Sequence, residues 1–199
     1  MAVVESGSGN GKSLAVNGRL EAAVFSVSET EGQAATEAGD AYNINTGDIS
    51  SISSGDASLI YFLNDEQEGI IIESIAIGLR GFTGLSDMAT ITIVRNPTGG
   101  DLITDETAVD MNANRNFGNA QTLKATSVAY KGKNSGTITG GDSIVQIYAN
   151  NNSRVFTSIN LELLRGSSIA IKVDSDATAG TAYAALIIHK KDALRELKQ

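Results

Sequence analysis

The chain of 199 residues contains no cysteine and no tryptophan, and it has one proline and one histidine. Without cysteine it has no disulfide framework, no thiol nucleophile and no cysteine-based zinc site. A zinc site built on several histidines is excluded as well, and a Ser-His-Asp triad would have to use His189. That residue ends an apolar segment, and the chain has no G-x-S-x-G elbow, so we interpret His189 as a strand-end histidine.

Positive charge is scarce. The chain has 15 lysines and arginines against 23 aspartates and glutamates, a net charge of −8, and only 5% aromatic residues. Nucleic-acid binding needs clustered basic side chains, so we expect no nucleic-acid partner and no docking on an anionic membrane. The longest apolar run, 69–79, is interrupted by Glu73 and is too short to span a bilayer. The N-terminus lacks a basic segment followed by an apolar one, which predicts no signal peptide.

One glycine-rich stretch imitates a nucleotide site. Residues 7–13 read GSGNGKS and end as a phosphate-binding loop does. That motif requires glycine at the place occupied by Ser6, with a strand before the loop and a helix after it. Neither element is predicted here, so we interpret the stretch as part of a flexible arm.

Short β-strands dominate the body of the chain. There are 21 glycines, and many serine, threonine, asparagine and aspartate residues separate the apolar runs. In 88–95, Ala89, Ile91 and Ile93 alternate with threonines, the period-two pattern of a half-buried strand. Predicted strands cover 57–63, 70–79, 88–95, 102–104, 121–132, 143–149, 155–164, 169–173 and 181–189, and 20–27 is either a short strand or a helical turn. This pattern predicts an all-β fold, an antiparallel β-sandwich of jelly-roll-like type.

The predicted organisation has three parts. Residues 1–40 are expected to form an extended N-terminal arm, in which 28–40 is loose and acidic. Residues 41–189 form the sandwich domain. Residues 190–199 are the only helical candidate, a short C-terminal helix or tail with two leucines three residues apart.

Paired carboxylates are the remaining candidates for chemistry. Asp105 with Glu106, and Asp174 with Asp176, could serve a carboxylate hydrolase, but sites that cleave carbohydrates usually add aromatic platforms. Asp174 and Asp176 could also ligate calcium, although the loop lacks the glycine and the distal glutamate of an EF-hand. A solvated turn explains them better. We therefore expect no enzyme activity, no metal and no cofactor.

Several segments resemble a group of small virion proteins of tailed bacteriophages. The resemblance lies in ITIVRNPTGGDLI (91–103), NRNFGNAQTLKATSVAYKGKNSGTITGG (114–141) and LLRGSSIAIKVDSDATAG (163–180), and 42–65 fits the same layout. It covers about residues 42–190 and concerns the order of strands and turns. It implies a β-sandwich that acts as a capsid decoration (cement) protein or as a head or tail fibre component.

The resemblance also implies partners and a location. The partner would be the major capsid protein, the protein would be a homotrimer on the capsid surface of the virion, and synthesis would occur in the bacterial host cytoplasm. The arm would lie across neighbouring capsid subunits. The residues expected to bind the capsid are Lys12, Leu14, Val16, Arg19 and Leu20.

A second hypothesis is a receptor- or carbohydrate-binding module of a fibre or tail. Its site would lie in loops 96–120 and 133–142, with Tyr130, Tyr148 or Phe117 as stacking platforms. Scattered aromatic residues are more often part of a core, so we place this hypothesis after the capsid protein.

Overall fold

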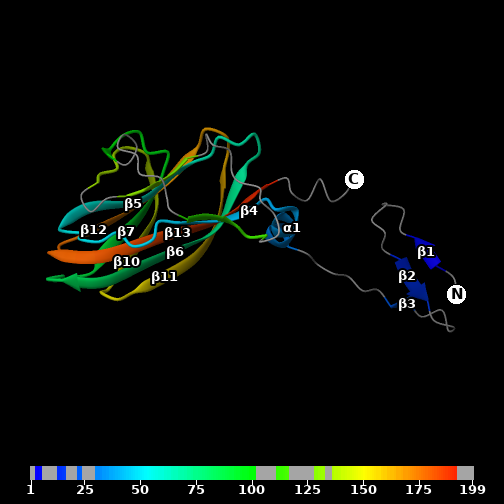
Figure 1. Cartoon of the computed structure of the whole chain (residues 1–199), viewed down its shortest axis with the longest axis horizontal. Helices are drawn as coiled ribbons and strands as arrows, with labels where there is room; N and C mark the ends of the chain where they lie inside the picture. The colour runs from blue at the N-terminus through cyan, green and yellow to red at the C-terminus, as the bar shows by residue number, and fades with distance from the viewer. Residues whose placement is uncertain are drawn as a thin grey trace.

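The computed structural model describes the backbone of residues 3–5, 13–16, 22–23, 30–101, 111–116, 128–132 and 136–191, and the side chains of 30–101, 115–116, 132 and 136–191. Two five-stranded antiparallel sheets pack face to face (Figure 1). The first sheet has the order β10 (Asp142–Ala149), β7 (Ala89–Arg95), β12 (Ser168–Ser175), β5 (Gly55–Leu63), β9 (Val128–Lys131). The second has the order β11 (Arg154–Leu163), β6 (Ile70–Thr83), β13 (Ala179–Lys190), β4 (Ala41–Asn45), β8 (Met111–Asn114). The predicted all-β antiparallel sandwich is confirmed.

Alternation of small and branched apolar residues builds the core between the two sheets. Along β7 the side chains of Ala89, Ile91 and Ile93 are fully buried, as their period-two spacing predicts. Along β13 every second residue is buried, namely Ala182, Ala184, Leu186 and Ile188. The odd-numbered residues of β13 therefore face outward, on the far side of the second sheet from the core.

Most predicted strands lie within two residues of their observed ends, and the largest difference is β6, which continues to Thr83. Of the predicted strand 121–132, residues 128–131 form β9 and 121–127 lie outside the described residues, as does 102–104. The predicted C-terminal helix 190–199 begins at a residue that instead closes β13, Lys190. Residues 192–199 lie outside the described part.

The expectation of a loose segment over 28–40 is wrong for α1 (Glu31–Ala38), which is a helix. Its N-cap, Thr30, forms a capping box with Gln33: the Gln33 amide donates to Thr30 Oγ1 at 3.3 Å, and the Thr30 amide donates to Gln33 Oε1 at 3.0 Å. Gly39 ends the helix in the left-handed region, with φ 83°. A small buried cluster of Ala35 and Ala41 with Ala38 fixes α1 on β4. Tertiary packing thus stabilises a helix too short to persist alone.

Further pairing occurs within the predicted arm. β1 (Val3–Glu5), β2 (Ser13–Val16) and β3 (Ala22–Ala23) form a small antiparallel sheet. Leu14 pairs with Val4, and Val16 pairs with Ala22. The other predicted capsid-binding residues, Lys12, Arg19 and Leu20, lie outside the described residues. Within the described ranges, no helix is long and apolar enough to cross a membrane.

Candidate functional site

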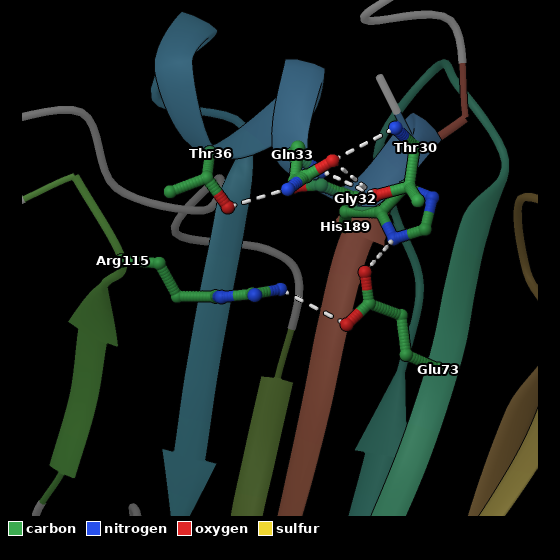
Figure 2. Close-up of polar contacts among 7 residues, drawn as sticks. All are labelled: Thr30, Gly32, Gln33, Thr36, Glu73, Arg115 and His189. Carbon is green, nitrogen blue, oxygen red and sulfur yellow. Dashed lines mark hydrogen bonds and ion pairs between the residues drawn. The ribbon is translucent and has the colours of Figure 1, made fainter. Parts of the chain in front are cut away.

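The single histidine belongs to a polar cluster beneath α1, on the outward face of the second sheet. His189 Nδ1 lies 3.0 Å from Glu73 Oε1, and Arg115 Nη1 donates to Glu73 Oε2 at 3.0 Å. Figure 2 shows Arg115 and His189 both pointing at the Glu73 carboxylate under the first turn of the helix. The His189 side chain is 4% exposed, whereas those of Glu73 and Arg115 are about one-quarter exposed. The cluster is thus nearly closed to solvent on the histidine side.

Local irregularities bring these three residues together. Ile187 pairs with Ser74 and Ile188 pairs with Ile72, so Glu73 is the extra residue of a β-bulge, which re-aims its side chain. Arg115 follows β8 at the sheet edge, where its amide donates to the carbonyl of Ala41 at 2.8 Å. Its side chain therefore reaches across β4 and β13 to the carboxylate on β6.

Gly32, in the first turn of α1, makes this arrangement possible. A Cβ atom at that position would overlap Glu73 Oε1. The carboxylate thus lies against the helix backbone, near the end where the helix dipole favours an anion. We call Gly32, Glu73, Arg115 and His189 the helix clasp, because together they join α1 to β6, β8 and β13.

The geometry of the helix clasp fits anchoring better than catalysis. A triad needs a hydroxyl aimed at the imidazole. The nearby hydroxyls are occupied locally, since Thr36 Oγ1 donates to Gly32 O at 2.7 Å and Thr30 Oγ1 donates to Gln33 Oε1 at 3.1 Å. Among the described residues, neither nitrogen of His189 has a hydrogen-bond partner of good geometry, so its contact with Glu73 is an ion pair when the imidazole is protonated. The location of His189 at the end of a strand agrees with the sequence prediction.

A second polar group lies on the core side of the same strand end. Lys190 Nζ is 3.6 Å from Asp40 Oδ1 and 3.4 Å from Glu66 Oε2, whose side chain is 3% exposed. Burial acts to lower the pKa of Lys190, but electrostatic interactions with Glu66, Tyr42 and Asp40 outweigh it and raise that pKa. Burial raises the pKa of the Tyr42 hydroxyl, which has no hydrogen-bond partner in the described part of the chain. This group closes one end of the core by mutual charge neutralisation.

The carboxylate pairs considered for hydrolysis or calcium do not form a site in the described ranges. Asp176 is engaged by Ser86, whose amide and hydroxyl both donate to its carboxylate. The Ser86 hydroxyl is the chief reason that the pKa of Asp176 is lowered. Asp174 lies in β12, and Asp105 and Glu106 lie outside the described residues. No group of three or more candidate metal ligands occurs within the described residues.

Of the aromatic platforms proposed for sugar binding, only Tyr148 has a described side chain. The side chain of Tyr148 is 66% exposed on β10. Tyr130 lies in β9 with only its backbone described, and Phe117 lies outside the described residues. Phe156, which is 67% exposed on β11, is not among the predicted platforms. The available signal was its alternation with Arg154 and Ser158, which places all three on the outward face of the strand.

Tyr148 and Phe156 mark one open side of the sandwich. β10 and β11 are each the outermost strand of their sheet, and the short turn 150–153 joins them. Their inward apolar residues remain only partly buried, namely Val145, Ile147, Val155, Ile159 and Leu161. We call β10 and β11 together the open edge.

Comparison with known protein families, with curated proteins and with solved structures finds no match to this chain.

Proposed function

We propose that this chain is a structural virion protein, which binds the outside of a bacteriophage capsid as a homotrimer and stabilises it. The observation that carries the proposal is the open edge, whose central residues 143–149 and 155–161 carry no charge and are covered by no described segment. The capsid as partner rests on the resemblance of segments 91–103, 114–141 and 163–180 to tailed-phage virion proteins.

The order of the strands supports a jelly roll, an arrangement used by viral capsid and lectin domains. Apart from the short β8 and β9, eight strands form the two sheets in the orders β10-β7-β12-β5 and β11-β6-β13-β4. Along the chain these strands change sheet at every connection except that from β7 to β10, which are hydrogen-bonded neighbours. Two four-stranded sheets with such crossing connections are what two interlocked Greek keys produce.

The composition of the open edge supports assembly. Edge strands normally avoid association by carrying lysine, proline or inward-pointing charge. Residues 143–149 and 155–161 contain none of these, although 19% of the chain is charged. Bulges interrupt both strands, between Ser143 and Val145 and between Ser158 and Leu161, but the inward apolar side chains remain only partly buried. Burying them against other copies of the chain would remove this surface from water.

Capsid stabilisation follows from mass action. A protein that binds only the assembled shell lowers the free energy of the shell by its binding free energy. In this proposal, the segment before α1 is an extended arm that contacts the capsid and contains Lys12, Leu14, Val16, Arg19 and Leu20. Segments that fold on binding can cover a large surface.

The trimer is tested by light scattering of the purified full chain. We expect a particle of three times the chain mass, and we expect Ser158→Lys, which places a charge on exposed β11, to convert it to monomer. Ser54→Lys is the matched control, because Ser54 is exposed before β5, away from the open edge. A monomer at all concentrations, or a trimer unaffected by Ser158→Lys, would contradict assembly through this edge.

The capsid role is tested by co-sedimentation with purified capsids of the phage that encodes the chain. The full chain should sediment with the capsids and raise their melting temperature, and deletion of residues 1–29 should weaken attachment while leaving α1 intact. Equal occupancy after the deletion would remove the arm from the proposal. Failure of the full chain to sediment would overturn the capsid role itself.

A further inference from the structure

A small cavity lies on the outward face of the second sheet, at the end remote from α1. Its volume is about 160 Å³. Three neighbouring strands form its floor, where Arg154 of β11 pairs with Gly78 of β6, and Gly78 pairs with Tyr183 of β13. One central position thus carries no side chain between two long ones. The cavity is smaller than the roughly 300–1,000 Å³ of pockets for drug-sized ligands, so it suits a single small ring.

Glycine at position 78 sets the position of the aromatic ring. A Cβ atom there would overlap the ring of Tyr183. The ring therefore lies over the backbone of β6 and forms one wall of the cavity. An aromatic wall of this kind can stack against the apolar face of a sugar or another ring.

Hydrogen bonds fix the turn that forms the other end of the cavity. Asn152 Oδ1 accepts from the amide of Gly81 at 3.2 Å, and the amide of Leu79 donates to Ser153 O at 2.9 Å. Asn152 lines the cavity, and its amide nitrogen donates no hydrogen bond to any described residue. This donor is therefore held in place and available to a ligand.

Charge distinguishes the cavity from the rest of the protein. Arg80 Nη2 lies 2.6 Å from Asp48 Oδ2, so the charges of these two side chains neutralise each other. Arg154, which also lines the cavity, forms no ion pair with any described residue. The lining is thus net positive in a chain of net charge −8. The planar fork of a guanidinium matches a carboxylate and binds it with two parallel hydrogen bonds.

We propose that this cavity binds one acidic sugar residue, a hexuronic acid. Arg154 binds the carboxylate of the sugar, and the ring of Tyr183 packs against the face of its pyranose ring. Asn152 and the Asp48–Arg80 pair form hydrogen bonds with the sugar hydroxyls. Arg154 is exposed, and sugar hydroxyls must give up hydrogen bonds to water, so we expect weak binding of a single sugar. Binding of a polymer by several copies of the chain would be stronger. This inference goes beyond the assembly role and does not depend on it.

The test is a titration of the full chain with sodium glucuronate, followed by NMR chemical shifts and calorimetry. Glucose, acetate and inorganic phosphate are separate arms. We expect glucuronate to bind at least about 10-fold more tightly than any of them, because each lacks either the charge or the ring. Arg154→Gln should weaken glucuronate binding about 10- to 100-fold.

Arg165→Gln is the matched control, an exposed arginine at a distant turn with Asp65 as its partner, and it should leave binding unchanged. Gly78→Ala should weaken glucuronate by displacing Tyr183, and its circular dichroism verifies the fold. Equal binding of glucuronate and glucose would overturn the role of Arg154. Equal binding of glucuronate, acetate and phosphate would reduce the cavity to a general anion site, and absence of glucuronate binding would overturn the proposal.

Discussion

Replacing Gly32 by alanine tests the helix clasp most directly, because two opposing effects of different size act at this position. Alanine stabilises an ordinary helix position by about 0.5–1 kcal/mol relative to glycine. Here its Cβ would overlap the Glu73 carboxylate. The sign of the change in unfolding free energy therefore reports whether that carboxylate lies where the structure places it.

The cost follows from the two ways in which the overlap can be relieved. If α1 lifts, the loss of packing costs about 1–3 kcal/mol, as for other overpacked sites. If Glu73 rotates away instead, it loses Arg115 and His189, and a half-buried charged hydrogen bond is worth about 1.5–3 kcal/mol. Either cost exceeds the gain in helix propensity. We expect Gly32→Ala to destabilise the protein by about 1–2 kcal/mol, a fall of roughly 2–8 °C in melting temperature for a chain of this size.

The assay is urea unfolding followed by circular dichroism, in two backgrounds. In the wild-type background Gly32→Ala should lower stability. In a Glu73→Ala background the overlap is gone, so the same change should raise stability by about 0.5–1 kcal/mol. Glu37→Ala, an exposed change on the same helix, is the control and should stay within about 0.5 kcal/mol. A stabilising Gly32→Ala, or equal effects in both backgrounds, would refute the reasoning.

Three further predictions concern other parts of the fold. Burial raises the pKa of Tyr42 in the folded protein above its ordinary value of 10.0. The contribution of the neutral hydroxyl to the free energy of unfolding is therefore fully present below pH 10.0 and is lost as the pH rises above that value. Tyr42→Phe should reduce this alkaline loss of stability in urea titrations. The pKa of Asp176 is lowered from its ordinary value of 3.8 in the folded protein, so the stability that its carboxylate contributes is present above pH 3.8 and is lost at lower pH. Asp176→Asn should therefore lower the urea midpoint at pH 7 but not in strong acid. Asn151 bonds both backbone groups of Phe82, at 2.9 and 2.8 Å. Asn151→Ala should therefore cost about 1–3 kcal/mol in thermal unfolding, and an unchanged midpoint would contradict the importance of this contact.

The helix α1 shows how a local signal can be present and still be overlooked. Thr30 and Gln33 have the spacing of a capping box, and Gly39 stands where a helix commonly ends. The composition of 28–40, rich in small and acidic residues, favours a loose segment instead. What stabilises the helix is the packing of its alanines on β4, and this contact has no counterpart in the local sequence.

The sequence by itself determined the class of fold. Alternating apolar residues separated by glycine-rich turns require strands with one buried face, and the absence of cysteine excludes disulfide and thiol chemistry whatever the topology. Period-two spacing also assigns each side chain to one of two faces, as at Ile91 and Ile93.

Only the tertiary structure decided which strands are neighbours. Alternation along one strand carries no information about the strand beside it, so Glu73, Arg115 and His189 could not be joined from the sequence. For the same reason, the sequence could not tell that β10 and β11 are edges, or that Gly78 lies between Arg154 and Tyr183. The helix clasp, the open edge and the cavity all arise from pairing between distant segments, which is determined by the packing of the whole chain.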